Sequence, residues 1–108
     1  MRNDLTWSPS EKKLARSLYD AAVQNELSEI IVEFKARAAA ISSPADMWEL
    51  EDYLRDRRTA FDYKYDYRYS RLIITFGGLL REGRVRDDDL QGLSEEKRQR
   101  IHYIASMT

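Results

Sequence analysis

The sequence contains no cysteine, and among its 108 residues it has a single histidine, two prolines and four glycines. The absence of cysteine excludes disulfides, thiolate metal ligands and thiol nucleophiles. With no second histidine either, we expect neither a zinc site nor one of the usual hydrolase triads, and we interpret His102 as a surface residue near a helix end. A glycine-rich phosphate loop and a dinucleotide fingerprint are also missing. We therefore expect no enzymatic activity, no cofactor and no small-molecule substrate.

Long hydrophobic runs are absent as well. No segment approaches the roughly 18 apolar residues of a membrane span, and residues 1–7 lack the apolar stretch of a signal peptide. We expect no membrane insertion, and a cytoplasmic protein is the default interpretation. The 18 basic and 19 acidic residues give a net charge of -1, without the basic excess that is typical of nucleic-acid-binding domains. Asp87–Asp89 lack the spaced ligands of a calcium loop, so we expect no metal site.

What the sequence does contain is enough apolar bulk for a folded core. Hydrophobic residues make up 43% of the chain, with seven Tyr, three Phe and two Trp. That composition excludes a disordered chain. The length predicts a single domain over residues 1–108, with a long-helix stalk over about 8–70 and a C-terminal head over about 71–108.

A long first helix begins after Ser8. Ser8 suits the N-cap, Pro9 the first helical position, and Glu11 the third position of a capping box. The apolar residues that follow recur in steps of three and four, which is typical of one face of a helix. They are Leu14, Leu18, Ala22, Val23, Leu27, Ile30, Ile31, Phe34, Ala38 and Ile41.

A second helix begins at Pro44, with Ser43 as its N-cap and Asp46 as the short arm of a capping box. Its apolar positions continue at helical steps as far as Leu79. Within it, the four tyrosines of the segment 63–69 alternate with charged residues, which alone favours a strand. Because both flanks are helical, we interpret this segment as helix, with two pairs of tyrosines spaced four residues apart.

The C-terminal part predicts two further helices and a short turn. The helix over 71–82 contains Gly77-Gly78, which indicates either the close approach of another helix or a bend, and Gly83 suits its C-terminal cap. A helical turn over 87–92 follows, and then Ser94 caps a last helix over about 95–107. The predicted fold is therefore all-α: a long antiparallel helical hairpin plus short C-terminal helices.

The hairpin carries an apolar stripe that is wider than one partner helix can cover. Such helix pairs bury the remainder by self-association, so we expect an antiparallel homodimer formed through the long helices. Arg57 falls within this stripe, where it either pairs with a carboxylate across the interface or marks the edge of the packed region. The residues expected at the dimer interface are Leu27, Ile31, Phe34, Met47, Leu50, Leu54, Arg57 and Phe61.

Trp48 lies on the opposite side of the second helix. If Trp48 is set at zero on the helical wheel, Asp52 lies at about 40°, Glu51 at about -60° and Arg58 at about -80°, whereas the apolar stripe centres near -130°. One interpretation is that Trp48 packs on a neighbouring helix of the dimer. The other is a partner-binding spot, because Trp and Arg carry binding energy more often than other residues do.

The sequence resembles the fluorescence recovery protein family. The resemblance rests on Met47–Leu54, on Arg57-Arg58, on Asp62–Ser70 and on Leu79–Gly83. It extends in order from Trp7-Ser8 to the last helix.

The resemblance implies a small all-helical dimer of cyanobacteria. Such a protein binds the light-activated orange carotenoid protein, mainly through the C-terminal domain of that partner. It accelerates return to the resting orange form and release from the phycobilisome, which ends photoprotective quenching. Attachment at the thylakoid surface through phycobilisomes is compatible with this role. The resemblance places the partner-binding patch at Trp48, Glu51, Asp52 and Arg58.

Some positions depart from the family pattern. The family has a histidine where this chain has Glu51, small residues where it has Arg55-Asp56, and a glycine where it has Tyr63. Glu51 makes the patch more negative than a histidine would. An alternative function is therefore open: a divergent homologue on the same dimeric scaffold, with a different protein partner and no recovery activity.

Overall fold

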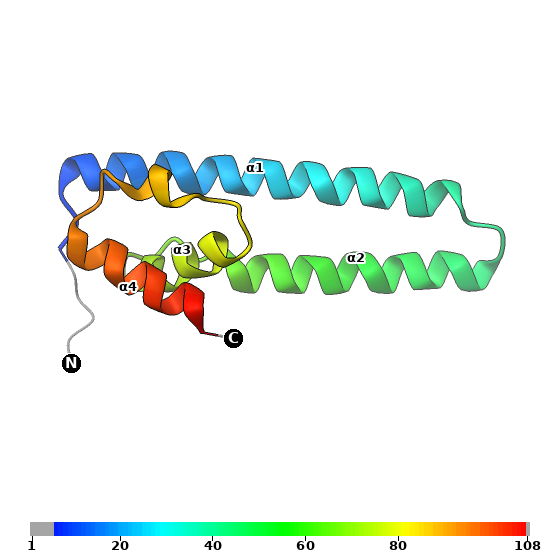
Figure 1. The fold of residues 1–108 in the computed structure, drawn as a ribbon. Helices are drawn as coiled ribbons and strands as arrows, with labels where there is room; N and C mark the ends of the chain where they lie inside the picture. The colour runs from blue at the N-terminus through cyan, green and yellow to red at the C-terminus, as the bar shows by residue number, and fades with distance from the viewer. Residues whose placement is uncertain (1–5, 108) are drawn as a thin grey trace. The chain divides into compact units, whose positions relative to one another are not determined.

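The computed structural model describes residues 6–107, which form four α-helices and one 3₁₀-helix without any strand (Figure 1). The predicted all-α fold is confirmed. The expectation of no signal peptide falls largely on residues 1–5, which lie outside the described residues. The elements are α1 (Pro9–Ala39), α2 (Pro44–Lys64), α3 (Leu72–Arg81), η1 (Asp87–Leu90) and α4 (Glu95–Ser106).

Helices α1, α2 and α4 begin at the serine caps that the sequence predicts. The Glu11 amide donates to Ser8 Oγ at 3.2 Å, and the Ser8 amide donates to Glu11 Oε1 at 2.9 Å, which is a complete capping box. At α4, the Lys97 amide donates to Ser94 Oγ at 3.2 Å. These contacts satisfy amides that the first turn of a helix leaves without a partner.

The turn between α1 and α2 differs in detail from the expectation. The Asp46 amide donates to Ser43 Oγ at 3.2 Å, but the Asp46 carboxylate accepts from the amide and the hydroxyl of Ser42 rather than from Ser43. The apolar spacing extends the first helix to Ile41, whereas α1 ends at Ala39. The amides of Ala40 and Ile41 bond to carbonyls three residues back, and this tighter turn closes the helix early.

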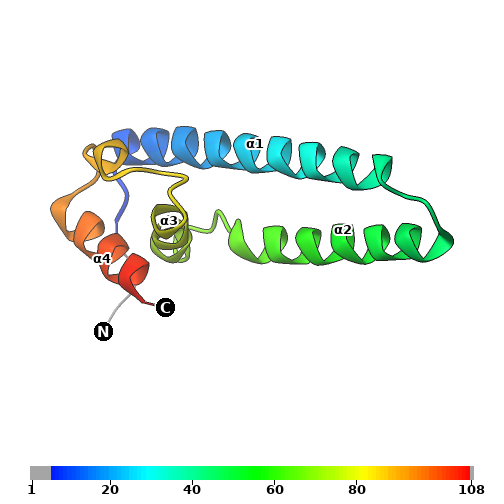
Figure 2. The same ribbon diagram turned by 45° about the vertical axis from the view of Figure 1, so that its right-hand side comes forward.

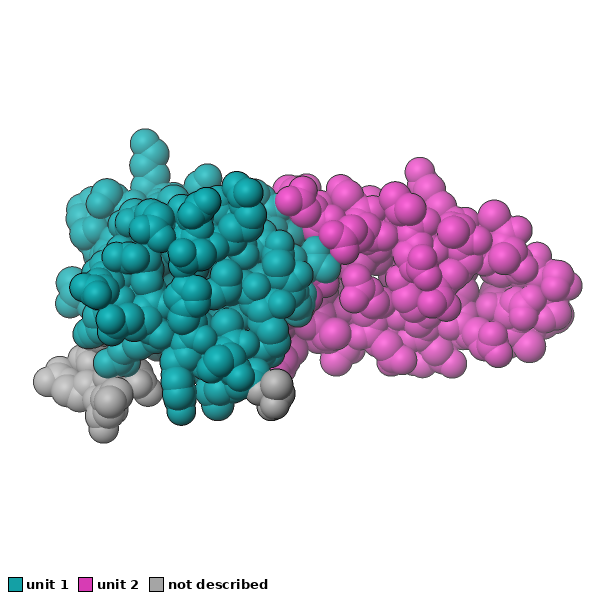
Figure 3. Space-filling model, in the orientation of Figure 1, with its two compact units in different colours: residues 1–22, 66–108 teal, residues 23–65 magenta. Residues whose placement is uncertain are grey.

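The chain divides into two compact units, which Figure 3 colours separately. The hairpin unit comprises residues 23–65, and the described part of the head unit comprises residues 6–22 and 66–107. The expectation of one domain, with a stalk over about 8–70 and a head over about 71–108, stays a prediction.

In the hairpin unit, the C-terminal part of α1 and the whole of α2 run antiparallel, joined by residues 40–43 (Figures 1 and 2). The predicted helical hairpin is thus confirmed. Few of its apolar side chains are covered: Leu50 is buried, whereas Leu27, Ile31, Met47 and Leu54 are exposed. The hairpin therefore presents most of its apolar stripe to the surroundings.

The head unit holds the hydrophobic core. Helix α3 packs against α4 at Gly77, where the backbone lies against the side chain of Ile104. This close approach is one of the two explanations that the sequence left open for the paired glycines. Gly83 has a φ of 76°, which suits its position at the end of α3. The buried apolar residues are Trp7, Ala15, Ala22, Leu72, Phe76, Leu79, Val85, Leu90, Leu93 and Ile101.

The predicted helix through the alternating tyrosines is wrong. Helix α2 ends at Lys64, and its C-cap Tyr65 is extended, with φ -96° and ψ 90°. The Asp66 carboxylate accepts from the Arg68 amide two residues on, a local turn that competes with helical hydrogen bonding. Tyr67 packs edge-on against Tyr19, with ring centroids 4.7 Å apart. Tertiary contacts and this turn together outweigh the local helical preference.

Candidate protein-interaction site

Trp48 lies on an exposed face of α2, as the helical wheel predicts. Its side chain remains 59% exposed, so nothing within the described chain covers most of the indole. Glu51 and Asp52, one turn on, are also exposed, as is Arg58. We call this surface the outer face of α2; it consists of Trp48, Glu51, Asp52, Arg55, Arg58, Asp62 and Tyr63.

Charged side chains on the outer face pair along the helix. Arg55 donates to the carboxylate of Asp52, and Arg58 lies 3.8 Å from Asp62. Both pairs are largely exposed, so each contributes little to stability. Each pair places a guanidinium group near a carboxylate of the same helix. Within residues 6–107, Glu51 has no such partner.

An apolar groove of about 340 Å³ lies beside this face. Leu27 and Ile30 line it from α1, and Leu54 and Phe61 line it from α2. Arg58 and Asp62 of the outer face also line it, which connects the groove with that face. Exposed apolar surface of this kind marks sites of protein association.

The eight residues expected at the dimer interface fall into three groups. Leu27, Ile31, Met47 and Leu54 are exposed, and Phe34 and Phe61 are half-buried. Leu50 is already buried within the single chain. Arg57 lies 3.6 Å from Glu26 of the same chain, so a carboxylate neighbours it without any second copy. A role of these residues in dimerisation stays a prediction.

The sequence reasoning missed the buried carboxylate of Glu26, which is only 1% exposed. It accepts hydrogen bonds from Lys64 Nζ and from the Tyr65 hydroxyl, each at 2.8 Å. A signal was present, because Glu26 falls on the same helical stripe as Ala15 and Ala22, which are both buried. The contact fixes the end of α2, and hence the register of the outer face, against α1.

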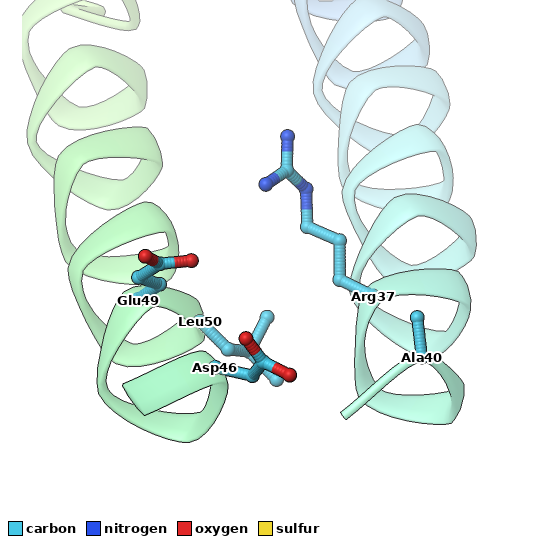
Figure 4. Close-up of a pocket in the computed structure, with 5 residues that line it drawn as sticks. All are labelled: Arg37, Ala40, Asp46, Glu49 and Leu50. Atoms are coloured by element: carbon cyan, nitrogen blue, oxygen red, sulfur yellow. The ribbon is translucent and has the colours of Figure 1, made fainter. Parts of the chain in front are cut away.

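A hollow of about 210 Å³ lies at the loop end of the hairpin (Figure 4). Arg37 projects from α1 into the space between the two helices, and Asp46 and Glu49 line the hollow from α2. The Arg37 guanidinium already pairs with Glu33 at 2.9 Å and stacks on Tyr53 at 4.0 Å. The amide and hydroxyl of Ser42 lower the pKa of the Asp46 carboxyl. Arg37 and Asp46 therefore already have partners within the chain.

Titratable groups elsewhere take structural roles. His102 is exposed on α4 and lies 2.6 Å from Asp87, which agrees with its interpretation as a surface residue. The Arg86 amide donates to the Asp89 carboxylate at 2.9 Å, which caps the turn. Among residues 6–107, no three histidine or acidic side chains converge as a metal site would require. None of the helices in that range is both long and apolar enough to cross a membrane.

The family model for the photoprotection regulator fluorescence recovery protein matches residues 7–105. The chain belongs to the fluorescence recovery protein family. It is 36% identical to the fluorescence recovery protein of Synechocystis sp. over 101 residues, which cover 94% of this chain and 93% of the relative. The resemblance seen in the sequence is thereby confirmed.

Solved structures of fluorescence recovery proteins share the fold. The structure from Fremyella diplosiphon matches with a TM-score of 0.90 and 32% identity, and that from Synechocystis sp. with 0.90 and 35%. Each comparison covers 94% of this chain and 100% of the solved one. Fluorescence recovery proteins are regulators of photoprotection rather than an enzyme family, and such regulation implies a protein partner.

Proposed function

We propose that this fluorescence recovery protein binds the light-activated orange carotenoid protein, mainly through the partner's C-terminal domain. Binding accelerates the return of the partner to its resting orange form and its release from the phycobilisome, which ends non-photochemical quenching. The protein acts as a homodimer, and its association with the thylakoid surface is peripheral, through phycobilisomes. The observation that carries the proposal is the exposed Trp48 among the charged residues of the outer face, in a chain of this family.

The physical requirement is differential binding. A protein accelerates the relaxation of its partner only if it binds the transition state, or a conformer on the return path, more tightly than the activated ground state. Trp48 provides an apolar anchor for that contact, and Asp52 and Arg58 provide charges, each near an oppositely charged neighbour on the same helix. No covalent step is involved.

The decisive experiment follows the red-to-orange recovery of a photoactivated orange carotenoid protein in the dark, with and without this chain. We expect clear acceleration by the wild type, and a loss of at least about tenfold with Trp48→Ala. Val32→Ala, which truncates a 69% exposed apolar side chain on α1, is the matched control and should keep the wild-type rate. Circular dichroism checks that all three proteins are equally helical.

A second candidate function rests on Glu51, which stands where the family has a histidine. In that case the chain is a divergent homologue whose partner is another protein. A folded wild type that gives no acceleration would favour this candidate. Acceleration by the wild type that is unchanged in Glu51→His would show that either residue serves at this position.

A further inference from the structure

Tyr63 is the most exposed of the large hydrophobic side chains in the described chain, at 83%. The three tyrosines that follow it each contact other residues of the chain. Tyr65 is buried, and its hydroxyl donates a hydrogen bond to Glu26. Tyr67 packs on Tyr19, and the ring centroids of Tyr69 and Trp7 lie 6.0 Å apart. Within residues 6–107, the Tyr63 ring makes neither an aromatic nor a cation–π contact, and its hydroxyl makes no hydrogen bond. The packing of the single chain therefore does not account for this side chain.

Tyr63 lies on the same face of α2 as Trp48. At about 100° per residue the two positions are about 60° apart around the helix, and at about 1.5 Å per residue they are about 22 Å apart along it. The apolar groove residues Leu54 and Phe61 lie about 160–180° from Tyr63 around α2, so the apolar side of the groove faces away from Tyr63. Trp48 and Tyr63 are thus the aromatic residues at the two ends of the outer face of α2, which we call the strip below.

The charges between these ends favour a protein as the occupant. Asp52 pairs with Arg55, and Arg58 with Asp62, so the strip carries no basic excess that would attract a nucleic acid or an anionic membrane. Glu51 adds one negative charge near the Trp48 end. Protein-binding surfaces are enriched in aromatic residues and arginine, and the strip contains both.

We propose that Tyr63 is a second aromatic anchor for the partner that Trp48 binds, so that the contact covers about four turns of α2. This rests on the proposed function. The complementary surface of the partner presents two apolar pockets about 20 Å apart, with a basic side chain opposite Glu51. Tyr63 extends the binding site beyond the four residues predicted from the sequence.

The test measures the affinity for photoactivated orange carotenoid protein and its recovery rate for Trp48→Ala, Tyr63→Ala and the double variant. We expect Tyr63→Ala to weaken binding about tenfold. The losses of the two single variants should multiply in the double variant, because the sites are too far apart to interact directly. Tyr63→Phe keeps the ring and should retain most of the affinity.

Tyr103→Ala is the matched control, since it removes a 68% exposed tyrosine from α4 and should bind as the wild type does. Alanine suits a helix better than tyrosine, so Tyr63→Ala is expected to fold. If Tyr63→Ala binds within twofold of the wild type while Trp48→Ala fails, the second anchor is refuted and the proposed function survives. If the wild type itself neither binds nor accelerates recovery, both proposals are overturned.

Discussion

Lys64 donates hydrogen bonds to both carboxylate oxygens of Glu26, at 2.8 Å each, although 38 residues separate them in the sequence. The carboxylate also accepts from Tyr65, the C-cap of α2. A buried charge is stable only when it is paired and hydrogen-bonded, so this contact ties the end of α2 to one position on α1. The same contact therefore fixes the positions of Trp48 and Tyr63 relative to α1, since both belong to α2.

Glu26→Ala is expected to lower the free energy of unfolding by about 3 kcal/mol, because it leaves Lys64 without its buried counter-charge. Glu33→Ala is the matched control on the same helix, since its pair with Arg37 is half-exposed and should cost less than about 1 kcal/mol. Urea unfolding measures both. Equal losses in the two variants would contradict the structural importance of the buried cluster.

The paired glycines of α3 are expected to respond oppositely to alanine. A Cβ on Gly77 would lie 2.5 Å from Ile104 Cβ and 3.3 Å from Ile101 O, whereas a Cβ on Gly78 would meet nothing within 4 Å. Gly77→Ala should destabilise by about 1–3 kcal/mol through overpacking. Gly78→Ala should stabilise by up to about 1 kcal/mol through helix propensity. Thermal unfolding distinguishes them, and a tolerated Gly77→Ala would refute the close contact between α3 and α4.

A fall in pH is expected to destabilise the head unit, because the carboxylate of Glu11 becomes protonated. Burial alone would raise the pKa of its carboxyl, but the amides of Ser8 and Ser94 and the ammonium of Lys97 bring this pKa below its ordinary value of 4.5. Because the folded pKa is lower than the unfolded one, the ionised carboxylate stabilises the fold above about pH 4.5. That stabilisation is lost as the pH falls through the folded pKa.

Urea midpoints of the wild type and of Glu11→Gln, measured between about pH 6 and pH 3, test this prediction. At about pH 6 the urea midpoint of Glu11→Gln should be lower than that of the wild type, and the gap between the two midpoints should narrow as the pH falls. A difference that stays constant over the whole range would mean that the ionisation of Glu11 does not stabilise the fold.

Dimerisation through the apolar groove predicts that Leu54→Glu produces a monomer, because it places a charge among Leu27, Ile30 and Phe61. Val32→Glu changes a more exposed apolar residue, on α1 and outside the groove, and should leave the dimer intact. Sedimentation velocity gives the molecular mass of each. A dimeric Leu54→Glu, or a monomeric wild type, would contradict the proposed interface.

Local signals in the sequence determined where α1, α2 and α4 begin and which way α2 faces. Ser8, Ser43 and Ser94 cap their helices because a cap is a contact between residues three apart, which the sequence contains in full. Helical periodicity likewise placed Trp48 away from the apolar stripe before any packing was known. The positive φ of Gly83 belongs to the same class of local features.

Only the tertiary structure decided where α2 ends and what Glu26 does. The helical flanks favour a helix through Tyr63–Tyr69, yet Tyr65 bonds to Glu26 and Tyr67 packs on Tyr19, partners that are tens of residues away. The burial of Glu26 likewise depends on Lys64, whose approach requires the hairpin to close. The end of α2 and the burial of Glu26 both depend on contacts between residues distant in the sequence. Helical periodicity and capping patterns involve only neighbouring residues, so they do not predict such contacts.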